Sequence, residues 1–252
     1  MTRAEGALEL LDGPVGAAAR AASLADIDRL NAWFGGYALT LREIRRVAAT
    51  APGRRLVVLD VGGGHAAFAA RLVRWARRAG RAIRVVVAER DAETLALARR
   101  TCAAYPEIAL VQADATALPF AEGAADVSVA SLTLHHLEPD GVVAALREMA
   151  ATARRAVVVN DLLRTRATLA LVWLATRLLW CHPISRHDGP LSVRRAYSGA
   201  ELSALGEKAG LERLAIREYR MFGRLVAVTG MSEARLAQAT HGARRPRGPR
   251  YT

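Results

Sequence analysis

The chain has little lysine, little cysteine and no pairing of cysteines that suggests a metal or redox site. Lys208 is the only lysine among 36 basic residues, so the net charge of +12 is almost entirely arginine. The arginines are scattered through expected helices and the end of the chain, and codon bias explains them as well as function does. We therefore do not expect a nucleic acid partner, although charge alone would allow one. Cys102 and Cys181 lie far apart, which favours a reducing compartment.

The sequence also lacks an apolar run long enough to cross a membrane. Arg177 interrupts the apolar segment 167–181, ATLALVWLATRLLWC, and leaves about half of the roughly 20 residues required. We expect a lid helix that lines an apolar pocket, with peripheral contact to a membrane surface as the alternative. The first residues carry acids and turn formers where a signal peptide needs an apolar core, so we expect a cytoplasmic protein.

Strand and helix patterns alternate from residue 55 onward. Continuous apolar runs typical of buried parallel strands occupy 55–61, 82–89, 108–114, 125–132 and 155–161. Helical patterns fall between or after them at 66–80, 92–105, 140–153 and 200–210. This order predicts a doubly wound α/β fold with a mostly parallel, seven-stranded Rossmann-like sheet. Two strands within 212–230 are expected to close the sheet as an antiparallel hairpin.

Three segments flank or interrupt the expected α/β domain, which we assign to residues 50–230. Residues 1–49 are predicted to form an N-terminal helical cover, with helices on both sides of Gly35–Gly36. Residues 162–199 interrupt the alternation after the fifth strand and are predicted to form a helical lid. Residues 231–252 are rich in arginine and have no apolar periodicity, so we expect a basic, disordered tail.

Three consecutive glycines follow the first strand in LDVGGGHAAF, residues 59–68. Without Cβ atoms, Gly62, Gly63 and Gly64 permit a tight turn and let backbone N–H groups approach a ligand closely. The position between a strand and a helix indicates a nucleoside-type ligand. The spacing Gly62-x-Gly64-x-x-Ala67 also satisfies the pattern that binds the pyrophosphate of a dinucleotide, so both ligands remain open on the glycines alone.

Acidic residues at the strand ends narrow this choice. Glu89 ends the second strand, where a carboxylate can accept hydrogen bonds from both ribose hydroxyls. Asp114 follows the third strand, where a carboxylate can accept a hydrogen bond from an adenine amino group. Asp60 immediately precedes the glycines and would repel a pyrophosphate but attract the ammonium of an amino acid. A short-chain reductase would need a tyrosine four residues before Lys208, and Ala204 stands there.

Residues 54–230 resemble the class I S-adenosylmethionine-dependent methyltransferases. The resemblance is carried by VLDVGGGHA (58–66), VVVAERDAETLALAR (85–99) and VQADATALPFAEGAADVSVASLTLHHL (111–137), the last being similar to the branch with quinone-biosynthesis enzymes. Ala66 stands where this family usually has a third glycine. The resemblance implies S-adenosylmethionine as cofactor, with Asp114 on the adenine and Ala115 beside its ring. The expected cofactor residues are Asp60, Gly62, Gly63, Gly64, Glu89, Arg90, Asp114, Ala115 and Ser131.

Segments outside these motifs suggest the acceptor. Residues 30–44, 157–165 and 185–202 are similar to a bacterial subgroup that methylates small aromatic or phenolic molecules, often near polyketide-type pathways. The resemblance implies methyl transfer to a hydroxyl oxygen of a small hydrophobic aromatic acceptor, phenol-like or quinol-like, in secondary metabolism. Carbon methylation of a quinone-type ring is the alternative. A non-catalytic binding module or an RNA methyltransferase is less favoured, since SLTL at 131–134 differs from the motif typical of base amino-group methylation.

Four polar residues are candidates for catalysis. His135 and His136 follow the fourth strand and face the crevice where such sheets bind ligands, so either is suited to take the proton of a phenol. The ordinary alternative is that they cap the next helix or fill the loop. Asp161 ends the fifth strand and is expected to contact substrate, and His187 is expected to pair with Asp188 on the lid. A turn built on Asp188-Gly189-Pro190 would explain Asp188 equally well.

Aromatic residues are expected to line the acceptor pocket, although such residues at helical spacing are commonly core. The candidates are Trp33, Phe34, Tyr37 and Trp173. No carboxylate cluster has the sequence spacing of metal ligands, so no metal is predicted. The sequence does not indicate an oligomeric state.

Overall fold

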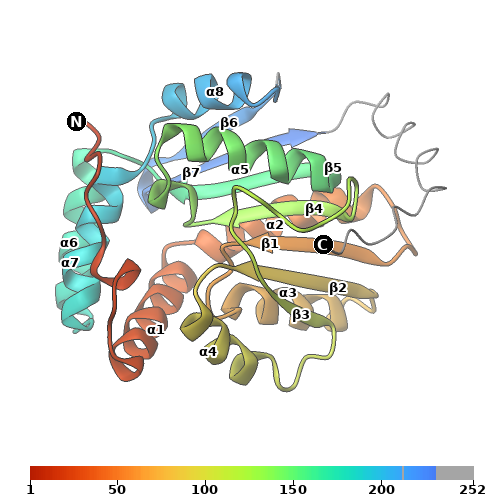
Figure 1. Ribbon diagram of the computed structural model, residues 1–252, viewed down its shortest axis with the longest axis horizontal. Coiled ribbons are helices and arrows are strands. Elements are labelled where there is room, and N and C mark those ends of the chain that lie inside the picture. The colour runs from red at the N-terminus through yellow and green to blue at the C-terminus, as the bar shows by residue number, and fades with distance from the viewer. Residues whose placement is uncertain (212, 231–252) are drawn as a thin grey trace, which may run out of the picture.

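The computed structural model describes residues 1–211 and 213–230, and the predicted basic tail lies outside this part of the chain. Its centre is a seven-stranded sheet with the order β3-β2-β1-β4-β5-β7-β6. Strands β1 to β5 pair in parallel, whereas β7 runs antiparallel to both β5 and β6 (Figure 1). The predicted doubly wound, Rossmann-like fold with an antiparallel hairpin is confirmed.

The strands follow the apolar runs of the sequence. Their bounds are β1 Leu56–Val61, β2 Ile83–Glu89, β3 Ile108–Gln112, β4 Ala125–Ser131, β5 Ala153–Leu162, β6 Ala215–Tyr219 and β7 Arg224–Gly230. Six of the seven residues of β4 are buried, because helices cover both faces of the sheet and leave no solvent-facing side. The hairpin between β6 and β7 turns through the short 3-10 helix η3 (Arg220–Phe222) and Gly223.

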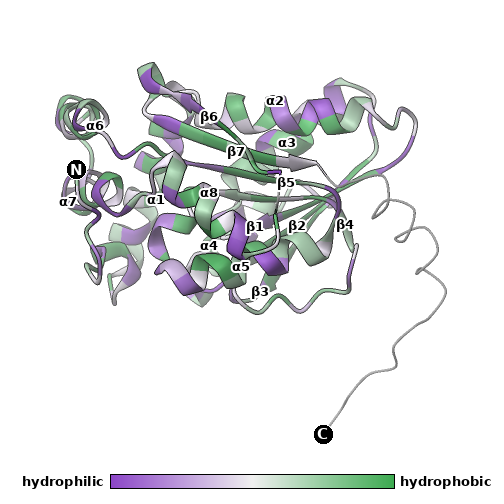
Figure 2. Ribbon diagram, turned by 90° about the horizontal axis from the view of Figure 1, so that it is seen from above, coloured by the Kyte–Doolittle hydropathy of each residue, from purple (hydrophilic) through white to green (hydrophobic). Residues whose placement is uncertain are grey.

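Helices pack on both faces of the sheet around two apolar clusters. One face carries α2 (Gly36–Ala49), α3 (Ala67–Arg78) and α4 (Ala92–Cys102), and the other carries α5 (Pro139–Thr152) and α8 (Gly199–Lys208). Figure 2 shows the apolar strands lying between these helices. Local signals fix helix starts: Asp91 caps α4, and Ser198 with Glu201 forms a capping box at α8.

A third group of elements gathers at the edge of the sheet where the parallel strands end. It consists of α1 (Ala17–Trp33), α6 (Arg166–Leu178), α7 (Pro183–Arg195) and the 3-10 helices η1 (Leu10–Asp12) and η2 (Leu134–His136). The N-terminal segment runs alongside α6 and α7 in both ribbon views (Figures 1 and 2). The expected lid is therefore a pair of helices. Among residues 1–211 and 213–230, no helix is long and apolar enough to cross a membrane.

Helix α7 differs from the expectation that Asp188-Gly189-Pro190 forms a turn. These residues lie within the helix, with Pro190 in its interior. Tertiary packing explains the difference, because a Cβ at Gly189 would lie 3.0 Å from Val172 Cγ1 of α6. The glycine allows the two lid helices to approach closely, and this contact outweighs the turn preference of the local sequence.

Candidate active site

A cavity of about 760 Å³ opens at the carboxyl ends of β1 to β4. All nine residues predicted to bind the cofactor line it: Asp60, Gly62, Gly63, Gly64, Glu89, Arg90, Asp114, Ala115 and Ser131. The opposite wall comes from η1, α1, α6, α7 and the start of β7. The volume lies within the range of small-molecule sites.

The glycine turn between β1 and α3 leaves no room for a side chain at Gly62 or Gly63. A Cβ at Gly62, whose φ is +65°, would lie 2.4 Å from Thr133 Cγ2, and one at Gly63 would lie 2.8 Å from Asp60 Oδ2. Gly64 also has a positive φ, and its N–H donates to Glu89 Oε2 at 3.0 Å. Ala66 adopts a φ of +64°, the left-handed region that favours glycine. Because alanine stands here in place of the usual third glycine, the backbone at Ala66 is locally strained.

Asp60 is a buried carboxylate without a compensating charge. It is 2% exposed, and its Oδ2 has no hydrogen-bond partner in the described part of the chain. Burial, followed by the negative charge of Glu89, raises the pKa of Asp60 to about 7. A positively charged group placed beside Asp60 would stabilise its ionised form.

Two further carboxylates are held by short-range hydrogen bonds. Glu89 accepts from the backbone N–H of Gly64 and, at 2.9 Å, from that of Asp91. Asp114 Oδ1 accepts from the N–H and hydroxyl of Thr116 at 2.8 and 2.6 Å, and these bonds lower the pKa of Asp114. A carboxylate has about four lone-pair sites, so both side chains retain acceptor capacity for a ligand. Ser131 Oγ is buried and has no partner among the described residues.

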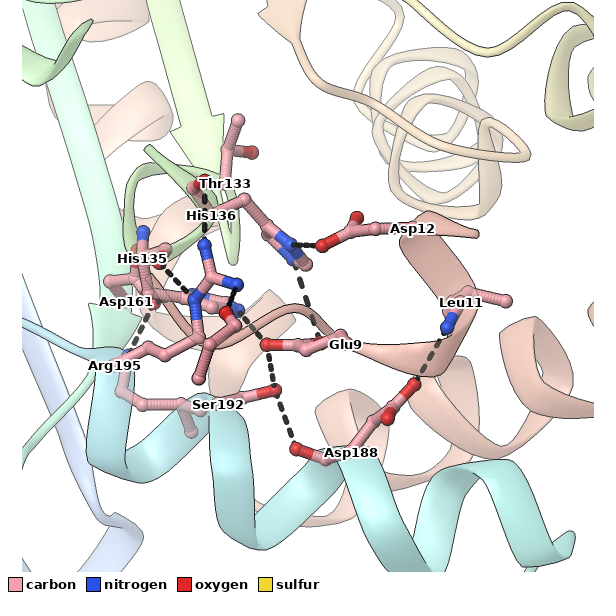
Figure 3. Close-up of polar contacts among 12 residues, drawn as sticks. Glu9, Leu11, Asp12, Thr133, His135, His136, Asp161, Asp188, Ser192 and Arg195 are labelled. Atoms are coloured by element: carbon pink, nitrogen blue, oxygen red, sulfur yellow. Dashed lines mark hydrogen bonds and ion pairs between the residues drawn. The ribbon is translucent and has the colours of Figure 1, made fainter. Parts of the chain in front are cut away.

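His135 is buried against Asp161 at the end of β5. Its Nδ1 lies 2.6 Å from Asp161 Oδ1, and Asp161 also accepts from the backbone N–H groups of His135 and Leu162 (Figure 3). Burial alone would raise the pKa of Asp161, but the charge and hydrogen bond of His135 outweigh it and hold the pKa below the ordinary value. Asp161 is not among the residues that line the cavity. Its carboxylate positions His135 and leaves substrate contact to other groups.

His136 stacks beside His135, with 4.3 Å between ring centroids. Its Nδ1 lies 3.1 Å from Asp12 Oδ2. Burial disfavours the imidazolium, but the hydrogen bond to Asp12 and the charges of Glu9 and Asp12 outweigh this and raise the pKa of His136. Both histidines line the cavity, and neither caps α5, whose N-cap is Glu138.

An N-terminal strap, defined as residues 3–12, covers the histidines. Asp188 of α7 accepts from the backbone N–H groups of Leu10 and Leu11, each at 2.9 Å. Arg195 donates to the carbonyl oxygens of His135 (3.0 Å) and His136 (2.7 Å) and also contacts the carbonyl of Ala7. Hydrogen bonds thus join the strap, α7 and the 3-10 helix η2, which carries both histidines, in one network (Figure 3).

Comparison with known proteins identifies the domain. The family model described as a methyltransferase domain matches residues 58–155, which include all the strand ends that line the cavity from β1 to β4. Residues 58–155 are therefore similar to a methyltransferase domain. No curated protein matches the chain by sequence.

Solved structures with the same fold include methyltransferases of differing kinds. A SAM-dependent methyltransferase from Aquifex aeolicus is 18% identical with a TM-score of 0.52, and the match covers 69% of this chain and 81% of that one. Magnesium protoporphyrin IX methyltransferase from Synechocystis PCC 6803 with bound SAH is 14% identical, with a TM-score of 0.54 and coverage of 88% and 90%. The CurJ carbon methyltransferase is 12% identical, with a TM-score of 0.58 and coverage of 77% and 53%.

The magnesium protoporphyrin IX methyltransferase of Synechocystis PCC 6803 has also been solved with bound SAM, and the cavity residues of this chain fit S-adenosylmethionine. The uncompensated carboxylate of Asp60 suits a ligand that carries positive charge, and the turn at Gly62 and Gly63 brings backbone close to it. Glu89 would accept from the ribose hydroxyls and Asp114 from the adenine amino group. When bound, the cofactor supplies an electrophilic methyl group on a sulfonium that leaves readily.

The predicted acceptor and lid residues divide into two groups. Phe34 and Tyr37 line the cavity, with Tyr37 stacked on Phe68. Trp33 and Trp173 are 63% and 49% exposed and do not line it. His187 pairs with Asp188 at 2.8 Å as expected, but its side chain also lies outside the cavity lining.

Several residues that line the cavity were not predicted. Glu9 and Asp12 face the histidines from the strap, and Arg224 enters from the start of β7. Arg224 is buried, donates to Asn31 Oδ1 at 2.7 Å and has its pKa lowered to about 10 by burial. Their neighbours in the cavity are distant in the sequence, so no local pattern marked them.

Proposed function

We propose that the protein transfers a methyl group from S-adenosylmethionine to a hydroxyl oxygen of a small hydrophobic aromatic acceptor. The composition of the cavity beyond the cofactor residues carries this proposal. That wall is largely apolar, with contributions from Leu24, Leu30, Phe34, Leu162, Leu171 and Phe222. Two polar groups interrupt it: Glu9 with His135 and His136, and Arg224 with Asn31, which are hydrogen-bonded to each other. An acceptor with an apolar ring and one reactive polar group matches this arrangement.

The reaction is a displacement at carbon. The acceptor oxygen forms a bond to the methyl carbon while the carbon–sulfur bond breaks and its electron pair stays on sulfur. Asp60, Glu89 and Asp114 bind and orient the cofactor, and the strap and lid helices enclose the acceptor side. Alignment and exclusion of water supply most of the rate enhancement, because the leaving group needs no help.

The acceptor hydroxyl must also lose its proton. A phenol has a pKa of about 10 by analogy with tyrosine, and the phenolate is the better nucleophile. The patch of Glu9, His135 and His136 is the polar part of the acceptor wall that contains groups able to accept a proton, so we place the hydroxyl there. The His135–Asp161 contact, at 2.6 Å, fixes the orientation of one imidazole for this purpose.

An acceptor screen tests the proposal. Purified protein is first titrated calorimetrically with S-adenosylmethionine and with NADH, and binding of the former alone is expected. It is then incubated with S-adenosylmethionine and a panel of phenols and quinols, with S-adenosylhomocysteine formation as the readout. NMR of the product is expected to show a methyl ether, and a methyl group on a ring carbon would overturn the oxygen assignment. Cofactor binding without turnover on any acceptor would instead indicate a binding module.

A further inference from the structure

We propose that Glu9, His135 and His136 form a binding site for a zinc ion. One nitrogen or oxygen atom from each of these side chains lies within 4.8 Å of the others. The Nε2 atoms of His135 and His136 face the Glu9 carboxylate at 3.7 and 4.0 Å. Both distances exceed those of a hydrogen bond, so the three groups converge without bonding one another. Sequence spacing did not indicate this site, because Glu9 lies far from the histidines in the chain.

The outer contacts orient both imidazoles for coordination. The Nδ1 atoms of His135 and His136 face the carboxylates of Asp161 and Asp12 at 2.6 and 3.1 Å. In the neutral imidazoles these contacts place the proton on Nδ1 and leave the Nε2 lone pair pointing inward, as assigned from the hydrogen bonds. Histidine ligands of zinc commonly have this carboxylate–histidine arrangement. Ser192 Oγ donates to Glu9 Oε1 at 2.8 Å and fixes the third ligand.

Charge and geometry favour a dication. The carboxylates of Glu9, Asp12 and Asp161 surround the two histidines, and the guanidinium of Arg195 donates to the carbonyl oxygens of both. A zinc ion would bind the imidazoles in their neutral form and displace their protons, so its charge would replace theirs beside these carboxylates. Tetrahedral zinc with ligands at about 2.0–2.2 Å separates them by about 3.4 Å, so the three side chains must move closer together to complete the site.

Two imidazoles and one carboxylate are a known ligand set for zinc with an open position. The three side chains line the cavity, so the open position is available to an acceptor. There the ion would lower the pKa of a coordinating hydroxyl, whose proton passes to water. This catalytic role rests on the proposed function, whereas zinc binding does not.

Calorimetry on untagged, chelator-treated protein tests the site. Titration with Zn²⁺ is expected to show one tight site per chain, and Co²⁺ is expected to give the visible absorption of a tetrahedral complex. Glu9→Gln and His136→Gln should each weaken Zn²⁺ binding by more than about 100-fold. Asp12→Asn, which alters only an outer partner, should weaken it by about 10–100-fold. His182→Asn is the matched control, because His182 does not line the cavity and asparagine preserves its N-cap role, so its affinity should equal that of the wild type.

Folding of each variant is checked by S-adenosylmethionine affinity, which should stay near the wild-type value. The proposal is overturned if the wild type shows no stoichiometric Zn²⁺ binding or if Glu9→Gln binds Zn²⁺ like the wild type. A protein that binds Zn²⁺ but methylates no acceptor would keep the metal site and lose the proposed function. Methyl transfer by zinc-free protein, together with no measurable Zn²⁺ binding, would keep the proposed function and remove the metal site.

Discussion

The two halves of the cavity are built in different ways. On the cofactor side, several hydrogen bonds link near neighbours, such as Asp114 with Thr116 and Glu89 with Asp91, each two residues apart, and Gly64 donates to Glu89 across 25 positions. On the acceptor side, Ser192 reaches Glu9 across 183 positions and Arg224 reaches Asn31 across 193. The comparison shows that the cofactor half is specified by local sequence, whereas the acceptor half depends on the completed fold.

Removing the strand-end carboxylates should have the largest effect and should be confined to the cofactor half. Asp60→Asn and Glu89→Ala are each expected to reduce S-adenosylmethionine affinity by about 100-fold, because each removes a charged partner of the ligand. Asp60→Asn should not lower thermal stability, since it removes a buried, uncompensated charge. Calorimetry and thermal unfolding measure the two effects. Unchanged affinity in both variants would contradict the cofactor assignment.

Replacing the histidines should affect the acceptor half alone. His136→Ala is expected to lower turnover at least tenfold, on the order of a lost acid–base or electrostatic contribution, with cofactor affinity near normal. His135→Ala leaves Asp161 buried without its partner and should also destabilise the protein by about 3 kcal/mol. Turnover at saturating cofactor and urea unfolding separate these results. Wild-type rates in both variants would remove the histidines from the reaction.

The pH dependence of cofactor binding should report Asp60. With a pKa of about 7, this carboxyl is protonated below neutrality, and a cationic ligand favours its ionised form. Affinity is therefore expected to rise with pH, by up to about tenfold per unit below pH 7, and to level off above it. Stability of the free protein should fall from about pH 4 to pH 7, because only the folded state retains this proton. Calorimetry at several pH values should show a flat profile for Asp60→Asn.

The smallest expected effect concerns the strained turn. Ala66→Gly relieves the positive φ at the start of α3 but adds freedom to the unfolded chain, so we expect a gain in stability of up to about 1 kcal/mol. Cofactor affinity should change less than twofold. Thermal unfolding measures the gain, and Ala67→Gly, one position into the helix, is the matched control that should lose stability. A stability loss at both positions would show that Ala66 is unstrained.

The same contrast between the two halves of the cavity explains which features of the structure could be predicted from the sequence. Alternating apolar runs predicted the sheet, and the strand-end positions of Asp60, Glu89 and Asp114 placed all of them in the cavity. The alternative interpretation of Asp188 as part of a turn was wrong, because packing of α7 on α6 overrides the preference of Gly189-Pro190. Glu9 had no recognisable signal, since its role arises only when the strap folds onto α7.

The strap also imposes an order on the assembly of the protein during translation. Leu10 and Leu11 leave the ribosome early, but their partner Asp188 follows 178 and 177 residues later. At about 5–20 residues per second, the first segment waits on the order of ten seconds or more for that partner. Strands β1 to β5, whose ends include the cofactor residues, have been synthesised by then. The acceptor wall is therefore the last part of the cavity to be completed.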